Sequence, residues 1–237
     1  IGRVWSFRDV TRRKRMKKIQ NTIYKISEAA NTVTNIDELY RSIHTIIAEL
    51  MPAKNLFIAQ YDESTSTLSF PYFIDEFDQT PAPRVMGRGM TEYVIRTGKP
   101  LLIYPNEFQE LIRSGEVEEI GADSFDWLGV PLKVREKIVG AIVVQSYTKN
   151  IGYNEEDKMI LNFVSEQIAM AIERRRTEES LRKSEANVIS IIENTSDMIW
   201  SIDRQYRIVA MNTTYRNVQK KLFDIDLEIG MHKLETL

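Results

Sequence analysis

The sequence predicts an α+β fold in which a central antiparallel sheet is covered by long helices. Residues 138–147 are apolar at both odd and even positions, which is typical of a strand buried on both faces. Residues 11–33 and 154–195 carry apolar side chains at alternating spacings of three and four, which is typical of helices that pack along one stripe. The two helices are therefore expected to flank one complete sheet domain.

The first predicted helix, residues 11–33, carries a narrow apolar stripe. Packing against its own domain would give a wider stripe, so the pattern favours a seam between helices. The stripe consists of Met16, Ile19, Ile23, Ile26, Ala30 and Val33. Asn35 is expected to cap a second helix, which ends at Met51-Pro52.

Five strands and two short helices are predicted before the long C-terminal helix. Thr91 is expected to cap a short helix that ends at Gly98, and another short helix is expected at residues 107–113. The strands are expected at residues 54–62, 68–75, 100–104, 127–134 and 138–147. The last strand is expected to place Ile138, Ile142 and Val144 on one face and Val139, Ala141 and Val143 on the other.

A helix of about 40 residues is predicted after Asn154, its expected N-cap, because no Gly or Pro interrupts the segment up to Thr195. A helix of this length cannot be buried in one small domain, so it is expected to project and to pair with another helix. Leu181 and Val188 continue an apolar seam through a charged stretch. The sequence thus predicts a homodimer formed through parallel helices.

Composition excludes several classes of function. The formal net charge of −2 gives no reason to bind nucleic acid, and the basic run at residues 12–15 is interpreted as a solvated helix face. No apolar run approaches the ~20 residues that span a bilayer, so no membrane contact is expected of this segment. The absence of cysteine fits a cytoplasmic location and excludes thiolate nucleophiles and Cys-linked haem or bilin.

Several short motifs follow one another along about residues 35–176. The N-terminal half of this stretch contains residues 37–40 (DELY), 70–73 (FPYF) and 89–98 (GMTEYVIRTG). The C-terminal half contains residues 127–132 (WLGVPL), 140–145 (GAIVVQ), 153–157 (YNEED) and 167–173 (QIAMAIE). In their order and spacing these motifs resemble the GAF domain family.

The resemblance implies a ligand pocket on the sheet face opposite to the terminal helices, with residues 77–125 as its roof. The implied ligand is an unidentified small molecule. Cyclic nucleotides are disfavoured, because Gln145-Ser146 and Tyr153 with Asp157-Lys158 stand where the nucleotide-binding members have other residues. The absence of cysteine excludes the methionine-sulfoxide reductase branch of the family. The candidate lining residues are Phe57, Tyr72, Arg84, Tyr93, Phe125, Trp127 and Gln145.

The two ends of the chain carry motifs of another kind. Residues 2–11 end in Asp9-Val10-Thr11, and this stretch resembles the final strand of a PAS domain with the Asp-x-Thr junction that precedes an outgoing helix. Residues 186–237 look like the opening of a second PAS domain. The chain is therefore expected to be a piece of a longer protein. Its expected parts are a PAS end at 1–11, a connecting helix at 12–34, the GAF domain at 35–176, a coiled-coil linker at 177–190 and a PAS start at 191–237.

A PAS–GAF–PAS string is typical of the sensory region of a bacterial or archaeal sensor histidine kinase in a two-component system. The chain is expected to have no catalytic role and to pass its ligand state to a downstream kinase domain of the same polypeptide. His44 is interpreted as a packed histidine, since the residues after it do not match a phosphoacceptor site. The expected transmission residues are Asp9, Thr11, Ile168, Leu181 and Val188.

Two other functions stay open. One is a ligand-free dimerisation or spacer module of a kinase, a diguanylate cyclase or a transcriptional regulator. The other is a small-molecule enzyme that uses the acids of the loop from Asp75 to Asp78. That loop lacks the spacing of a calcium site and is otherwise expected to be solvated.

Overall fold

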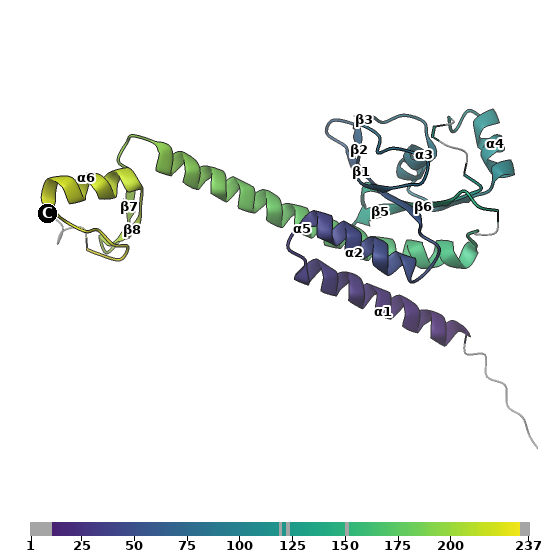
Figure 1. The fold of residues 1–237 in the computed structure, drawn as a ribbon, viewed down its shortest axis with the longest axis horizontal. Coiled ribbons are helices and arrows are strands. Elements are labelled where there is room, and N and C mark those ends of the chain that lie inside the picture. The colour runs from purple at the N-terminus through teal and green to yellow at the C-terminus, as the bar shows by residue number, and fades with distance from the viewer. Residues whose placement is uncertain (1–10, 119, 122–123, 150–151, 233–237) are drawn as a thin grey trace, which may run out of the picture. The chain divides into compact units, whose positions relative to one another are not determined.

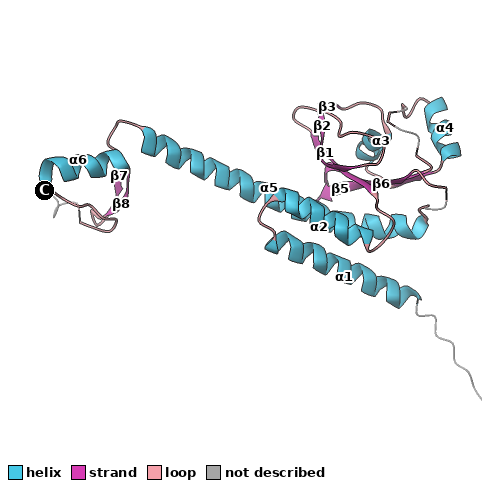
Figure 2. Cartoon of the chain, in the orientation of Figure 1, coloured by secondary structure: helices cyan, strands magenta, loops and turns pink. Residues whose placement is uncertain are grey.

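The computed structural model describes residues 11–118, 120–121, 124–149 and 152–232. The expected PAS strand at the N-terminus, including Asp9, lies outside these residues, and so does the side chain of Thr11. The chain divides into two compact units, Ile1–Arg176 and Thr177–Leu237. Figure 1 and Figure 2 show the elements of each unit.

The first unit contains a six-stranded sheet with the strand order β3-β2-β1-β6-β5-β4. Every neighbouring pair of strands is antiparallel, as predicted. The strands are β1 (Asn55–Asp62), β2 (Thr67–Ile74), β3 (Arg84–Val85), β4 (Leu101–Ile103), β5 (Asp126–Val134) and β6 (Lys137–Ser146). The central strands β1 and β6 are buried over most of their length, which explains why their sequences are apolar on both faces.

One face of the sheet is covered by α2 (Ile36–Ala48) and the first part of α5 (Glu155–Asn194), and α1 (Thr11–Thr32) packs against these two helices. Side chains alternate along each strand, so one set of strand residues meets these helices. In this core, Leu56, Leu128 and Val144 pack with Ile43 of α2 and Leu161 of α5, all fully buried. Two arginines of α5 also hold the end of α1: Arg174 Nη1 donates to Asn31 Oδ1 (3.0 Å) and Arg175 Nη2 to the Val33 carbonyl (2.8 Å).

The opposite face of the sheet carries α3 (Met90–Thr97), α4 (Pro105–Arg113) and the connecting loops. The other set of strand residues builds a second core there. It includes Phe57, Trp127 and Val143 from the sheet with Val94 and Ile95 from α3. The sheet is therefore covered on both faces, as the apolar pattern predicted.

A bulge in β6 reverses two of the predicted side-chain directions. Leu132 pairs with Gly140 whereas Lys133 pairs with Ile138, so Val139 is an extra residue. Ile138 consequently packs with the α3 side and Val139 with the α5 side, the reverse of the prediction. The directions predicted for residues 141–144, beyond the bulge, are correct.

Most of the predicted helix ends are confirmed by their hydrogen bonds. Asn35 accepts from the Glu38 amide, and Asn154 Oδ1 accepts from the amides of Glu156 (2.8 Å) and Asp157 (3.2 Å). Gly98 ends α3 in the left-handed conformation that glycine favours, with φ of 63°. The cap predicted for Thr91 is wrong, because α3 begins earlier and Gly89 is its N-cap.

The apolar stripe of α1 is largely covered within its own unit. Ile26 is fully buried and Ile19 nearly so, and both belong to the core that contains α2 and α5. Ile168 of α5 is also fully buried in this core. The stripe is thus a seam between helices, but one formed inside a single chain, and neither Ile26 nor Ile168 is available to a second copy.

The second unit contains a hairpin of β7 (Trp200–Ile202) and β8 (Ile208–Met211), followed by α6 (Thr213–Phe223). Its small core consists of Ile208, Tyr215 and Leu227. The indole ring of Trp200 stacks on Tyr215 with a centroid distance of 4.7 Å. Within the described parts of both units, each helix is too short or too polar to pass through a bilayer.

Candidate ligand-binding site

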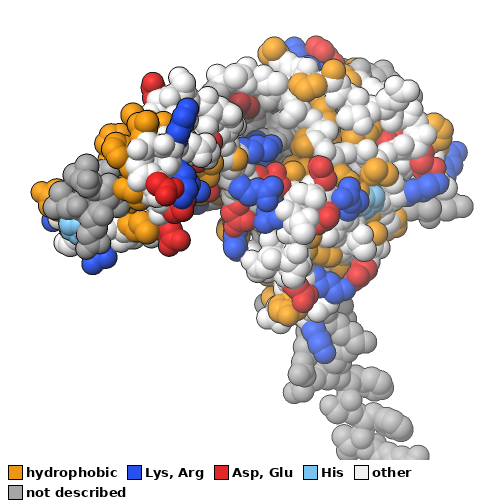
Figure 3. All heavy atoms as spheres, turned by 60° about the vertical axis from the view of Figure 1, so that its left-hand side comes forward, with side chains coloured by type: hydrophobic (Ala, Val, Ile, Leu, Met, Phe, Trp, Pro, Cys, Tyr) orange, Lys and Arg blue, Asp and Glu red, His pale blue; other side chains and the backbone are white. Residues whose placement is uncertain are grey.

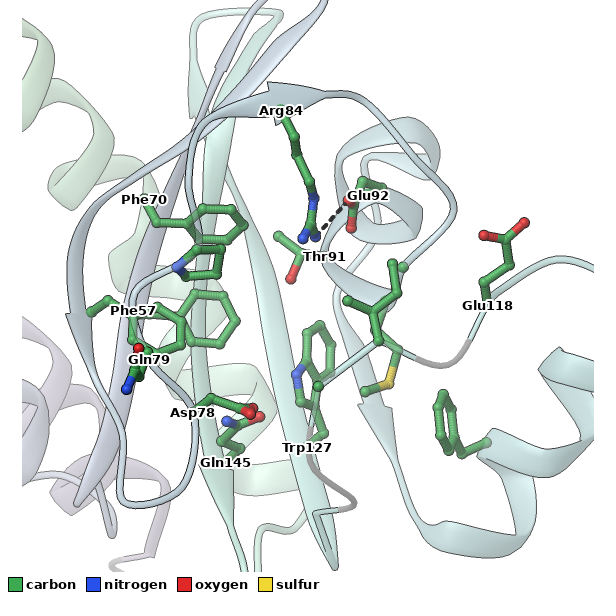
Figure 4. A pocket seen from close by; sticks show the side chains of 17 residues that line it. Phe57, Phe70, Asp78, Gln79, Arg84, Thr91, Glu92, Glu118, Trp127 and Gln145 are labelled. Carbon is green, nitrogen blue, oxygen red and sulfur yellow. Dashed lines mark hydrogen bonds and ion pairs between the residues drawn. The ribbon is translucent and has the colours of Figure 1, made fainter.

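A cavity of about 180 Å³ lies on the sheet face opposite to α1, α2 and α5. The strands supply its floor, and α3, α4 and the loops around them supply its walls (Figure 4). It is lined by Phe57, Phe70, Phe73, Asp78, Gln79, Pro81, Arg84, Gly89, Met90, Thr91, Glu92, Phe108, Glu118, Ile120, Gly121, Trp127 and Gln145.

Aromatic rings form much of the cavity lining. Phe57 and Phe73 are stacked, with centroids 5.1 Å apart, and Phe70 meets both edge to face at 5.9 and 6.1 Å. Figure 4 shows Phe57 and Phe70 on one side of the cavity and Trp127 on the other. Such an arrangement suits a flat or apolar ligand body, since rings offer large apolar faces at little entropic cost.

An ion pair closes one end of the cavity. Arg84 Nη2 donates to Glu92 Oε1 at 3.0 Å, and the Arg84 guanidinium lies 5.4 Å from the centre of the Phe70 ring. Glu92 is 1% exposed, whereas Arg84 is 35% exposed. Burial of a carboxylate is costly unless it is paired, so the ion pair with Arg84 offsets part of the cost of burying Glu92.

A second polar cluster ties the roof loop to β6. Asp75 accepts hydrogen bonds from Gln145 Nε2 at 2.6 Å and from the Tyr147 hydroxyl at 3.0 Å. Burial raises the pKa of the Tyr147 phenol far above its usual value, and the nearby Asp75 charge raises it further. Tyr147 therefore remains a neutral hydrogen-bond donor at physiological pH.

Four of the predicted lining residues do line the cavity: Phe57, Arg84, Trp127 and Gln145. The other three lie elsewhere. Tyr93 is on α3 with the Arg96 guanidinium over its ring, at 5.6 Å. Phe125 borders a different, more open hollow beside α4, and Lys149 lies over its ring at 5.5 Å.

Tyr72 points to the helix-covered face, because β2 contains an irregularity. Ile58 pairs with Tyr72 whereas Gln60 pairs with Ser69, so Phe70 and Pro71 together face one residue of β1. The alternation shifts there, and Phe70 and Phe73 both face the cavity. Nothing in the spacing of the FPYF motif reveals such a shift, which is why sequence reasoning missed both rings.

His44 occupies the other face of the sheet together with Tyr72. Its Nδ1 lies 2.7 Å from the Tyr72 hydroxyl oxygen, and its Nε2 lies 2.6 Å from the Ala53 carbonyl oxygen. Burial raises the pKa of the Tyr72 phenol, so this hydroxyl remains protonated. Both ring nitrogens of His44 are engaged in packing α2 onto the sheet, which agrees with the interpretation as a packed histidine.

The acidic loop from Asp75 to Asp78 was expected to be solvated, but two of its carboxylates have specific positions in the structure. Asp75 makes the hydrogen bonds to Gln145 and Tyr147, and Asp78 lines the cavity. Among the described residues, no three His, Cys, Asp or Glu side chains lie close enough to hold a metal ion. The cavity lining consists instead of aromatic rings, hydrogen-bonding side chains and charged groups.

A six-stranded antiparallel sheet with terminal helices on one face and a lined cavity on the other defines the class of the protein as a small ligand-binding domain of α+β type. The chain belongs to the GAF domain family, because the family model for the GAF domain matches residues 33–173. This agrees with the resemblance inferred from the motifs. No curated protein matches the chain.

Solved structures of GAF domains share this fold. The GAF domain of a phosphoenolpyruvate-protein phosphotransferase from Coxiella burnetii has a TM-score of 0.54 and 14% identity, over 69% of this chain and 98% of that chain. The free methionine-R-sulfoxide reductase from Neisseria meningitidis has a TM-score of 0.54 and 14% identity, over 75% and 98%. A putative GAF sensor protein from Burkholderia vietnamiensis has a TM-score of 0.51 and 10% identity, over 68% and 97%. At such low identity the likeness shows the fold alone.

Proposed function

We propose that this chain is the sensory segment of a two-component signalling protein. Its GAF cavity binds a small molecule, and the bound state passes through dimeric helices to a histidine kinase domain further along the same polypeptide. The observation that carries the proposal is the cavity itself, which combines aromatic walls with the Arg84–Glu92 ion pair and lies on the sheet that also anchors α5.

The strands under the cavity connect it to α5. Trp127 of β5 lines the cavity, while the next residue, Leu128, is fully buried in the core that contains Leu161 of α5. In β6, likewise, Gln145 lines the cavity and its neighbour Val144 is buried in the core that contains Leu161. A ligand that shifts these strands would therefore shift the packing under α5, because close-packed cores transmit displacement.

A hydrogen-bond chain offers a second route to α5. The Tyr104 hydroxyl, at the start of α4, donates to the Tyr153 carbonyl at 3.0 Å. The Tyr153 hydroxyl donates to the Pro52 carbonyl at 2.9 Å, just before β1. Tyr153 lies immediately ahead of the α5 cap, Asn154, so movement of α4 beside the cavity would reach the first turn of α5.

The second unit is proposed to be the start of a PAS domain, as its motifs suggested. Its hairpin leaves Trp200 44%, Ile202 40% and Val209 52% exposed. A hairpin alone is marginally stable in water. These exposed apolar side chains therefore support the proposal that further strands complete a larger sheet. The PAS end at residues 1–11 remains a proposal on motif grounds alone.

Homodimerisation is proposed to use the outer face of α5. Within the first unit this helix exposes Met159, Phe163 and Met170, which recur at spacings of four and seven. Leu181 and Val188 are exposed at 60% and 53% in the second. Each of the two sets is an exposed apolar edge that a parallel copy would cover. Lys/Arg and Asp/Glu side chains are interspersed over the face seen in Figure 3, which does not favour nucleic acid as the partner.

The proposal assigns no catalytic step to this chain. An enzymatic reading would depend on the acids of the loop from Asp75 to Asp78, and Asp75 is already engaged by Gln145 and Tyr147. The sulfoxide reductase from Neisseria shows that the fold can hold an enzyme. The cysteine-dependent chemistry inferred for that branch of the family has no counterpart here, because the sequence contains no cysteine.

Native mass spectrometry of the freshly purified chain tests ligand binding. The wild-type chain is expected to carry a bound small molecule. Trp127→Ala should lose it, because this substitution removes one wall of the cavity, and Tyr72→Phe should keep it, because Tyr72 lies on the other sheet face. A wild-type chain with no bound molecule that also binds nothing in a metabolite screen would support the spacer function instead.

A further inference from the structure

We propose that the GAF cavity takes a small uncharged aromatic compound whose ring carries an acceptor oxygen, such as that of a ketone, and that Arg84 recognises this oxygen. The inference rests on the proposed function, since it names the chemical class of the ligand for the same site. Three observations support it: a buried guanidinium nitrogen without an acceptor, a positive charge that is already matched, and walls made of aromatic rings.

The nitrogen without an acceptor is Nε of Arg84, a residue of the cavity lining. This atom is covered from solvent, and in the part of the chain that the structure describes no group accepts a hydrogen bond from it. A buried donor without an acceptor costs free energy, and folded proteins leave few of them. A ligand oxygen that accepts from Nε would remove this cost on binding.

Two contacts keep the guanidinium at the cavity. Its Nη2 donates to Glu92 Oε1 at 3.0 Å, and its central carbon lies 5.4 Å from the centre of the Phe70 ring. Figure 4 shows the Arg84 side chain reaching between Phe70 and Glu92. The donor is therefore held beside the ligand space before any ligand binds, which lowers the entropic cost of recognition.

The acceptor oxygen can reach Nε because Arg84 is only partly enclosed. The strand that carries it, β3, has two residues and lies at the edge of the sheet beside β2. The Arg84 side chain is 35% exposed, in contrast to 1% for Glu92. The ligand oxygen reaches Nε after a small turn of the Arg84 side chain, during which Nη2 keeps its contact with Glu92.

The charge of Arg84 determines which class of acceptor fits. The guanidinium is paired with the carboxylate of Glu92, so its positive charge is already matched. A ligand carboxylate at Nε would bring a second negative charge close to the buried Glu92, which disfavours its binding. An ammonium group carries donors only and cannot accept from Nε. An uncharged oxygen gains a hydrogen bond from a charged donor and adds no net charge.

The aromatic walls select the body of the ligand. Phe57, Phe70 and Phe73 gather on one side, and Trp127 lies opposite with 3% exposure. A flat ring packs well between such walls. Because the Arg84 guanidinium lies over the Phe70 ring, an oxygen bound close to the ligand ring can meet Arg84 while that ring packs on the phenylalanines.

A series of probes built on one ring tests the inference. The full chain is titrated by calorimetry near neutral pH with acetophenone, ethylbenzene, benzoate and benzylamine. Acetophenone, the uncharged acceptor, is expected to bind most tightly of the four. The decisive comparison is with ethylbenzene, because this more apolar compound would bind more tightly if the cavity offered apolar contact alone.

Arg84→Lys isolates the hydrogen bond from the charge. A lysine methylene takes the place of Nε, while the lysine ammonium group can still pair with Glu92. The substitution should weaken acetophenone binding at least about tenfold and leave ethylbenzene binding nearly unchanged. The control Arg113→Lys, at an exposed position of α4, should change neither.

Ethylbenzene binding as tight as that of acetophenone would overturn the inference, and so would an equal loss of both ligands in Arg84→Lys. Tighter binding of benzoate or benzylamine would assign a charged ligand class instead. In each of these cases ligand binding by the cavity would stand. Failure of all four probes at millimolar concentration would also reject this ligand class, and native mass spectrometry would then decide separately whether the cavity is a ligand site.

A direct readout keeps the test decisive should Arg84→Lys fail to fold. The wild-type series still decides the ligand class in that case. In addition, the Nε–H signal of Arg84 in a ¹H–¹⁵N spectrum of the wild-type chain must move further downfield with acetophenone than with ethylbenzene. Equal movement with the two compounds would show that Nε donates no hydrogen bond to the ligand.

Discussion

The side chain of Asn212 connects three segments of the second unit through hydrogen bonds. It is fully buried in the second unit. Its amide nitrogen donates to the carbonyls of Ile192 (3.0 Å) and Asp197 (2.9 Å), and its oxygen accepts from the amides of Ile199 (3.1 Å) and Tyr215 (3.0 Å). The same residue therefore joins the end of α5, the start of the hairpin and the cap of α6.

Asn212→Ala is expected to destabilise the second unit by about 2 kcal/mol, because it leaves buried backbone groups without partners and removes a helix cap. The control is Asn217→Ala, at an exposed position on the same helix. Hydrogen exchange over residues 195–223 measures the effect. Equal protection in the two variants would show that Asn212 does not hold these segments together.

At the scale of the helices and strands, the sequence predicted the architecture well. The presence of each helix and strand follows from the period of its apolar residues, because those residues are buried in the cores. The caps Asn35 and Asn154 could be predicted because an Asn before a helix commonly accepts hydrogen bonds from the first backbone amides. The errors have local causes. Bulges at Phe70-Pro71 and Val139 shift the alternation of side chains, and they depend on the partner strand, which spacing within one strand does not show.

The candidate site was harder to predict than the fold. Phe57 and Trp127 lie on strands whose alternation is regular, so the resemblance placed them correctly. The sequence around Glu92 gives no sign that this carboxylate is buried in the wall of a cavity. Its role depends on Arg84 and Gly89, which a turn of the chain brings to it and which no local pattern marks.

The outer face of α5 yields a prediction about assembly. Phe163→Glu should shift a dimer toward monomer, because it places a charge in the middle of the exposed apolar stripe without entering the core: Phe163 is 54% exposed. Sedimentation velocity over a range of concentrations measures the shift. Glu166→Gln, exposed on the same helix, is the control and should leave the assembly unchanged. A wild-type monomer at high concentration would contradict the proposed dimer.

At the scale of the whole molecule, α5 is the element that the proposed relay uses to connect ligand binding with output. It is one helix of 40 residues that begins under the GAF sheet, and its last residues belong to the second unit. Its middle, residues 174–183, is rich in charged residues, so a seam there is weak. Two registers of such a seam can differ by only a few kcal/mol, which is the range that a bound ligand can shift.

Insertions into α5 test this account most directly. One residue added after Glu179 turns everything beyond it by about 100°, whereas seven added residues nearly restore the original facing of the helix. In the full-length signalling protein, we expect the single insertion to abolish or invert the response of kinase output to ligand and the seven-residue insertion largely to preserve it. If both proteins respond like the wild type, α5 is only a tether, and the proposed relay through it is wrong.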